Sequence, residues 1–331
     1  MGTGSKGVQV KHEGSQLKTS RTVRPNVVVV GSLHMDLTVK ARKLPRLGET
    51  VLGDEFKMST GGKGANQAVA AAKLGASVTL IGRVGTDKFG RDLIRNAERH
   101  AIDTSFIVKD NRVWTGLALI MVDEKGNNMI AVAPGADTKC SKGDIDRADS
   151  AIRAADVLLT QLETPLPVVE YAIQRACAHG VRVILNPSPA QTLPASLLER
   201  TYALIPNERE AERISGVSVK NLFSAKRAIE KILEKGVKNI ILTMGKQGAL
   251  IGTKEKIEHV ASPKVNTVDT TGAGDAFSGA LAVAISAGKS LEKAVAFANC
   301  AGALATTKIG AQEAMPTRHE LENFMKEKGL T

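Results

Sequence analysis

Apolar runs alternate with alanine-rich segments along most of the chain. Runs bounded by glycine or polar residues predict buried strands, and the segments between them have the spacing of helices. Strands are predicted at 26–31, 77–82, 157–160, 181–185, 202–205, 239–243 and 257–268, and helices at 62–74, 88–100, 165–178, 221–234, 273–286, 291–306 and 318–326. This alternation favours an α/β fold in which helices cover both faces of a mostly parallel central sheet.

Two stretches, at about 37–58 and 113–133, interrupt the alternation. They have the pattern of short strands with turns at Pro45 and at Lys125-Gly126, and they contain no helical segment. We therefore expect a small antiparallel sheet beside the main body. Such a sheet, lying over the carboxyl ends of the parallel strands, would form a lid.

Residues 1–24 are rich in glycine, serine, threonine and lysine. They lack the apolar core of a secretory signal and are predicted to form a disordered extension, which leaves one α/β domain over residues 25–331. No apolar run approaches the roughly 20 residues of a membrane helix, so no membrane association is expected. Three widely spaced cysteines fit a reducing compartment, and a cytoplasmic location is predicted.

The net charge is +11, from 45 basic and 34 acidic residues. Residues 1–24 hold five cations and one anion, so +4 lies there and +7 on the remainder of the chain. A nucleic-acid surface would combine this charge with stacking aromatics, but the chain has one Trp and two Tyr, and no nucleic-acid binding is expected. The positive excess suits a phosphorylated substrate such as ATP.

The segment DTTGAGDAF, residues 269–277, joins a predicted strand to a predicted helix. Its glycines free backbone N–H groups at the positive end of the helix dipole, which favours an anion. Asp275 lies in the same turn, as expected of a site that takes a proton from a hydroxyl while phosphate charge develops. A tight turn with Asp275 as helix N-cap is the alternative, and this segment alone favours neither.

Polar side chains also follow four other predicted strands, where open α/β sheets bind ligands. They are Asp36 in GSLHMD, Lys63 and Asn66 in GGKGAN, Glu163 in QLE, and Asn207 and Glu210 in PNEREAE. Carboxylates and amides suit the vicinal hydroxyls of a sugar, and an Asn with a Glu suits a hydrated Mg²⁺. Each residue alone is typical of a cap or a solvated surface, whereas their recurrence at strand ends favours a site.

Other nucleotide and metal motifs are absent from the sequence. No GxxxxGK[ST] loop occurs, and GSLHMD lacks the later glycines of a dinucleotide fingerprint. No histidine pairs with a second His or a Cys at zinc spacing, and no GxSxG elbow is present.

The chain from 26 to 324 resembles the ribokinase/fructokinase-type family of sugar kinases. GGKGANQAVAAAKLGA and VDTTGAGDAFSGAL resemble the two signatures of that family, and QLE, NPSPA, PNExE and KIGAQ occur in the family's order. The resemblance implies a ribokinase-like fold and ATP-dependent phosphorylation of the 5-hydroxyl of D-ribose. It also implies a homodimer formed through the lid sheets.

The resemblance further implies roles for single residues. Asp275 would be the catalytic base, beside an anion hole formed by the N–H groups of Gly272, Ala273 and Gly274. The sugar would be held by His34, Asp36, Gly62, Lys63, Asn66 and Glu163, and ATP by Asn207, Thr243, Gly245 and Asn299. Glu210 would order Mg²⁺ through water, and K⁺ would be bound by Asp269 and Thr271 with the backbone near Ala305, Lys308 and Gly310.

Two departures from the family pattern leave alternatives open. His34 replaces an Asn that is common two residues before the sugar-binding Asp, and Ala314 replaces a Ser often found near the end of the potassium loop. The first keeps open a kinase for 2-deoxyribose or another sugar or nucleoside, although few aromatics argue against a nucleobase. A non-catalytic sugar-binding regulator is a further alternative, against which the retained Asp275 and Glu210 argue.

Overall fold

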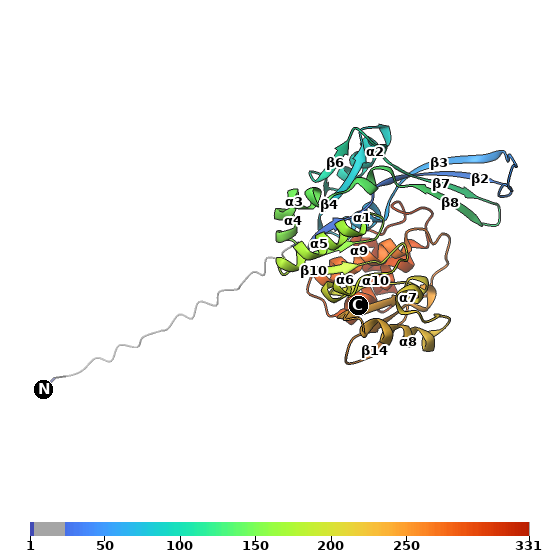
Figure 1. Cartoon of the computed structure of the whole chain (residues 1–331). Helices are drawn as coiled ribbons and strands as arrows, with labels where there is room; N and C mark the ends of the chain where they lie inside the picture. Colours follow the sequence, from blue (N-terminus) through green and yellow to red (C-terminus); the bar gives the residue numbers. More distant parts are fainter. Residues whose placement is uncertain (3–23, 331) are drawn as a thin grey trace.

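The computed structural model describes residues 1–2 and 24–330, so the disordered extension predicted for residues 1–24 lies almost wholly outside the described residues. The body is an α/β sandwich from which a second, four-stranded sheet projects (Figure 1). The central sheet has the order β14-β13-β12-β11-β10-β9-β1-β4-β5, with β6 also paired to β4. The strands from β12 to β5 in this order run parallel to one another, and β13 pairs antiparallel with both β12 and β14.

The strands of the central sheet are short. They are β1 (Asn26–Val30), β4 (Ser77–Gly85), β5 (Ile102–Asp103), β6 (Ile107–Asp110), β9 (Val157–Thr160), β10 (Arg182–Leu185), β11 (Ala203–Leu204), β12 (Asn239–Thr243), β13 (Ala249–Gly252) and β14 (Ile257–Val260).

Helices cover both faces of this sheet, as the sequence predicts. They are α1 (Lys63–Lys73), α2 (Lys88–Arg99), α3 (Lys142–Arg147), α4 (Asp149–Ala154), α5 (Leu166–Ala178), α6 (Ala195–Arg200), α7 (Glu208–Ser215), α8 (Leu222–Leu233), α9 (Ala273–Ser286), α10 (Leu291–Ala305) and α11 (Arg318–Glu327), with short 3₁₀ turns η1 (Gly135–Lys139) and η2 (Gly245–Gln247).

Side-chain alternation along the strands divides the apolar core into two layers. Val27 and Val29 of β1 pack in the layer formed with α1, α2, α9, α10 and α11. Val28 and Val30 point to the other face and pack with α3 to α8. Because both faces are covered, β1 is a continuous run of valines without polar alternation.

The second sheet consists of β2 (His34–Ala41), β3 (Gly53–Gly61), β7 (Gly116–Val122) and β8 (Asn128–Ala133), in the order β3-β2-β7-β8. It occupies the region where the sequence predicts a lid. The pairing is mixed rather than purely antiparallel, because β2 and β7 run parallel. The chain passes through the main body between these two strands, and a crossover of this kind permits parallel pairing.

The predicted strand at 257–268 is wrong in its second half. β14 ends at Val260, and residues 261–272 form no regular structure before α9 begins. Pro263 lies in this stretch and has no N–H to donate to a strand ladder. The glycine turn therefore follows a loop, and this loop lines a cavity described below.

Helices α1 and α9 pack unusually closely because Gly279 of α9 faces α1. A Cβ at this position would lie 2.6 Å from Ala70 Cβ and 2.8 Å from the carbonyl oxygen of Gln67. This approach brings the first turns of both helices together. Throughout residues 1–2 and 24–330, no helix is long and apolar enough to cross a bilayer.

We expect Gly279→Ala to lower the free energy of unfolding by about 1–3 kcal/mol, because the added methyl group overpacks this contact. Gly274→Ala in the same helix is the control, since a Cβ there meets no atom within 4 Å. The control is expected to be neutral or stabilising by up to about 1 kcal/mol. Urea unfolding of both variants measures the difference, and equal midpoints would contradict the packing argument.

Candidate active site

Two polar regions meet at the first turn of α9. One is a cluster of charged side chains at the ends of β1 and β9 and the start of β2. The other is a cavity of about 1140 Å³ between α7, β12, α9 and α10. Asp275, in the first turn of α9, lies where the two regions join.

Glu163, which follows β9, organises the charged cluster. Its Oε2 accepts hydrogen bonds from Ser32 Oγ at 2.5 Å and from the Lys63 N–H at 3.0 Å. The same oxygen lies 3.3 Å from His34 Nε2. Three protein donors therefore hold one oxygen of Glu163, the carboxylate for which the family resemblance implies sugar binding.

His34 lies in the middle of this cluster and is 7% exposed. Its Nδ1 is 3.6 Å from Asp36 Oδ1. Burial disfavours the imidazolium, but the carboxylates of Asp36, Glu163 and Asp137 outweigh it and raise the pKa of His34 to about 10. Burial opposes ionisation of Glu163 too, yet His34 and Lys63 lower its pKa to about 2. His34 is therefore a cation at neutral pH.

Asp137, in η1, is a member of the cluster that the sequence analysis did not identify. Its Oδ1 accepts the Leu33 N–H at 2.9 Å, and its side chain is fully buried. Burial raises the pKa of Asp137 to about 8, although the charge of His34 works in the opposite direction. No local sequence signal marks Asp137, because the hydrogen bond from Leu33 that holds it near His34 spans 104 residues.

Lys63 and Asn66 enter the site from the start of α1. Gly62 is the residue before this helix, with φ +92°, and a Cβ there would lie 2.7 Å from the carbonyl oxygen of Ser32. Burial opposes the charge on Lys63, but the carboxylates of Asp275, Glu163 and Glu210 raise its pKa. The ammonium group thus lies among three acids from different elements.

Two amides hold the carboxylate of Asp275. Asn66 Nδ2 donates to Oδ2 at 3.0 Å, and Gln67 Nε2 donates to Oδ1 at 2.9 Å. Burial raises the pKa of Asp275, against the opposing effects of Lys63 and the two amides. The sequence analysis missed Gln67, although it follows Asn66 directly in GGKGANQ.

Asp275 is not the N-cap of α9, so the alternative interpretation of this turn is wrong. The N-cap is Gly272, with φ +73°, and it provides no side-chain cap. The Ala273 N–H donates to the Thr270 carbonyl at 3.2 Å. The N–H groups of Gly272 and Gly274 donate to no other described residue. These N–H groups are available to an anion.

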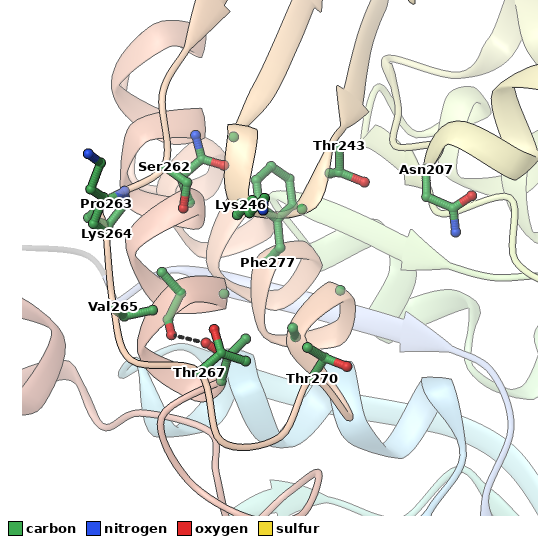
Figure 2. A pocket seen from close by; sticks show the side chains of 18 of the residues that line it. Asn207, Thr243, Lys246, Ser262, Pro263, Lys264, Val265, Thr267, Thr270 and Phe277 are labelled. Atoms are coloured by element: carbon green, nitrogen blue, oxygen red, sulfur yellow. Dashed lines mark hydrogen bonds between the residues drawn. The ribbon is translucent and has the colours of Figure 1, made fainter. Parts of the chain in front are cut away.

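The cavity is lined by all four residues predicted to bind ATP. Asn207, Thr243, Gly245 and Asn299 contribute to its wall, together with Ala273 and Gly274 from the first turn of α9. Figure 2 shows Asn207 and Thr243 on one side and the loop of Ser262, Pro263 and Lys264 on the other. The sequence missed this loop because it treated the segment as a strand, and it missed Phe277, which adds an aromatic wall.

Asn207 and Glu210 form a capping box at the start of α7. Glu210 Oε2 accepts the Asn207 N–H at 2.9 Å, and Asn207 Oδ1 accepts the Glu210 N–H at 2.9 Å. Burial raises the pKa of Glu210, partly offset by the Asn207 N–H. Among the described residues, no three His, Cys, Asp or Glu side chains gather to hold a metal. Few protein ligands are what a hydrated Mg²⁺ requires.

Asp269 joins the two loops predicted to bind K⁺. Its Oδ1 accepts the Thr271 N–H at 2.9 Å, and its Oδ2 accepts the Gly310 N–H at 2.9 Å. Burial opposes the charge, but these donors lower the pKa of Asp269. Each oxygen of the Asp269 carboxylate therefore accepts a main-chain N–H, one from each of the two loops.

The other members of the predicted K⁺ loop are placed as follows. The Ala305 carbonyl accepts the Lys308 N–H at 3.2 Å. The Lys308 ammonium pairs with Glu320 at 2.7 Å, so its side chain is engaged outside the loop. Ala314 is fully buried and, as the sequence indicates, supplies no hydroxyl.

Comparison with known proteins gives consistent results. Residues 24–318 match the profile described as pfkB family carbohydrate kinase. The ribokinase of Haemophilus influenzae is 38% identical over 92% of this chain and 99% of its own length, and that of Staphylococcus aureus is 39% identical over 89% and 98%. A deoxyribokinase of Salmonella typhi is 37% identical over 91% and 98%. The structure of Arabidopsis thaliana ribokinase complexed with ribose and ATP has a TM-score of 0.85 and 32% identity, covering 92% of this chain and 99% of that one.

The charge on His34 makes stability depend on pH. From its unfolded value of 6.5 up to about 10, the folded protein keeps a proton that the unfolded chain releases, so this contribution falls as pH rises. We expect His34→Asn to reduce the fall in unfolding free energy between pH 7 and 9, by up to about 1.4 kcal/mol per pH unit. Urea unfolding at several pH values measures the slope. The exposed His319→Asn should keep the parental slope, and an unchanged slope in His34→Asn would contradict the buried imidazolium.

Proposed function

The chain belongs to the pfkB family of carbohydrate kinases, and we propose that it transfers the γ-phosphoryl group of ATP to the 5-hydroxyl of D-ribose. The observation that carries this proposal is the position of Asp275. This buried carboxylate lies in the same helix turn as the free N–H donors of Gly272 and Gly274, between a charged pocket and a large cavity. A proton acceptor and an anion site side by side are the two parts that phosphoryl transfer to a hydroxyl requires.

In the proposed mechanism, Asp275 orients the sugar hydroxyl and accepts its proton late, because phosphoryl transfer has a loose transition state. The N–H groups of Gly272 and Gly274 would stabilise the negative charge on the migrating phosphoryl group. Ala273 would join them once its bond to Thr270 opens. Burial of the carboxylate supports this role, since it brings the pKa of Asp275 closer to neutrality.

The charged cluster is the proposed ribose pocket. Ring hydroxyls would bind the carboxylate of Asp36, the amide of Asn66 and the ammonium of Lys63, which offer both acceptors and donors. Gly62, His34 and Glu163 complete the pocket in this proposal. Glu163 keeps Oε1 available while Oε2 is held by protein donors. The lid strand β2 carries His34 and Asp36, so sugar binding and lid position are connected.

The large cavity is the proposed ATP site, with Asn207, Thr243, Gly245 and Asn299 in its wall. Its volume exceeds the roughly 300–1,000 Å³ of most small-ligand pockets, which allows a nucleotide. When bound, Mg²⁺ would neutralise phosphate charge, and Glu210 would hold its waters. K⁺ would lie between the Asp269–Thr271 segment and the backbone of Ala305, Lys308 and Gly310, fixing the loop before the anion site.

We place this activity in the cytoplasm. All three cysteines are free thiols, two of them buried, which agrees with a reducing compartment.

Asp275→Asn is expected to lower kcat for ribose phosphorylation by about 10²–10⁴-fold, because the amide cannot accept the proton. Ribose binding, measured by calorimetry, should remain near the parental affinity. Glu292→Gln removes a carboxylate from the first turn of α10 and should leave turnover unchanged. ATP turnover across ribose, 2-deoxyribose and fructose tests the substrate assignment. Ribose turned over no better than fructose would refute the assignment, and near-parental kcat in Asp275→Asn would refute the role of the base.

We also propose that the protein is a homodimer formed through the lid sheet. The strand register places two rows of apolar side chains on one face. They are Met58, Leu37, Leu119 and Ala131 in one row, and Phe56, Val39, Met121 and Met129 in the next. Phe56 is 60% exposed, and Met58, Leu119 and Met129 are each just over half exposed. A second copy of this face is the proposed occupant, because a flat apolar sheet face is self-complementary under two-fold symmetry.

Met129→Lys should convert the proposed dimer to a monomer, since it places a charge on the apolar face, at its edge strand β8. Ile130→Lys is the matched control, because Ile130 is the next residue of β8, equally exposed, and points to the opposite face. Sedimentation equilibrium gives the masses. A parental protein of monomer mass at micromolar concentration would overturn the proposal, as would dissociation of both variants alike.

A further inference from the structure

Gln312 is a buried glutamine that the proposed mechanism does not use. It lies after α10 and is 3% exposed. Its Nε2 donates to Asn66 Oδ1 at 2.9 Å. Its Oε1 accepts from Thr60 Oγ1 at 2.9 Å and from Asn96 Nδ2 at 2.7 Å. All the hydrogen bonds of its side chain therefore go to side chains of other elements.

The direction of every bond in this chain is fixed by its last member. Asp275 accepts and cannot donate when ionised, so Asn66 must present its NH₂ group to it. The Asn66 oxygen then faces Gln312, which must in turn present its own NH₂ group. The remaining oxygen of Gln312 needs donors, and a hydroxyl and an amide supply them. Reversing any one amide would place two oxygens or two NH₂ groups against each other.

The members of this chain, including Asp275 of α9, come from five parts of the fold. Thr60 is in the lid strand β3, Asn96 in α2 and Asn66 in α1. The main chain around Gln312 is fixed separately, because Lys73 Nζ donates to the carbonyls of Gln312 at 3.0 Å and Met315 at 2.7 Å. The glutamine is thus held at a junction between the lid, two helices and the loop after α10.

The second oxygen of Asp275 is held independently. Gln67 Nε2 donates to Oδ1, and Gln161 Nε2 donates to Gln67 Oε1 at 2.6 Å. Removing Gln312 would therefore release one of the two amides on Asp275 and leave the other in place. The carboxylate would stay in the site with its hydrogen bonding reduced.

We propose that Gln312 is a positioning residue for phosphoryl transfer, which holds the Asn66 amide in the one orientation that donates to Asp275 and links this base to lid strand β3. The inference rests on the proposed function, because it assigns a task within the same reaction. Without Gln312, the Asn66 amide can turn its oxygen toward Asp275. The ionised carboxylate then loses a donor and gains a repulsive neighbour.

The other charges that act on Asp275 do not change in this comparison. Lys63 reaches it from α1, Glu163 from the end of β9 and Glu210 from α7. None of these three groups hydrogen-bonds Gln312 among the described residues. A change in the titration of Asp275 on substitution of Gln312 can therefore be assigned to the amide chain.

The test is Gln312→Met, which keeps the length of the side chain and removes its polar groups. We expect the acid limb of the kcat profile to move to higher pH by about one unit, which is about a tenfold loss of kcat on that limb. KM for ATP should stay within twofold. Gln174→Met, on the exposed face of α5, is the control and should match the parental profile.

Carbon-13 NMR of the Asp275 carboxyl group, in the ligand-free parent and in Gln312→Met, keeps this inference separate from the proposed function. A raised pKa in the variant supports the positioning role even if ribose proves not to be the substrate. The inference would be overturned if both the Asp275 titration and the kcat profile of the variant stayed within about 0.2 pH units of the parent. Should Gln312→Met not fold, Gln312→Glu replaces it. The introduced carboxyl can donate to Asn66 only while protonated, so kcat should fall with rising pH, and a parental plateau would equally overturn the inference.

Discussion

The whole site depends on one constraint: the buried carboxylate of Asp275 must be surrounded by donors. A carboxylate without donors at this depth would take up a proton and lose its use as a base. The donors come from Asn66 and Gln67, which sit together at the start of α1. They reach Asp275 because α1 and α9 touch at Gly279, where no side chain separates them. Local helix packing thus sets the chemistry of the acid.

Charge balance extends the same constraint to the sugar pocket. Lys63 acts on three carboxylates at once, and His34 adds a second buried cation beside Glu163, Asp36 and Asp137. An imidazolium in place of a neutral amide is stable here because the carboxylates of Asp36 and Glu163 lie 3.6 and 3.3 Å from its ring nitrogens. In the proposed ribose pocket, a sugar that lacks one hydroxyl would leave a charged group unpaired.

Much of this arrangement could be predicted from the sequence, and the exceptions have physical reasons. The alternation of strands and helices and the signature segments are local patterns. The helices and strands, and the grouping of the signature residues at one site, could therefore be predicted. The prediction of a strand at 257–268 was wrong in its second half because it followed the alternating pattern and gave too little weight to Pro263. The loop that lines the cavity was missed for the same reason. Asp137 and Gln312 act through contacts across 104 and 246 residues. Only the folded chain brings such partners together.

In the proposed function, the lid strand β2 takes part in both substrate binding and self-association. Successive residues of a strand point to opposite faces, so Asp36 faces the pocket while Leu37 and Val39 belong to the apolar face. A rotation of this strand moves both faces together. The neighbouring row of this face contains Thr60, whose hydroxyl donates to Gln312 and is connected through it and Asn66 to Asp275. In the proposed arrangement, one sheet connects association, closure over the sugar and alignment of Asp275, so a change at any of them would change the energy of the other two.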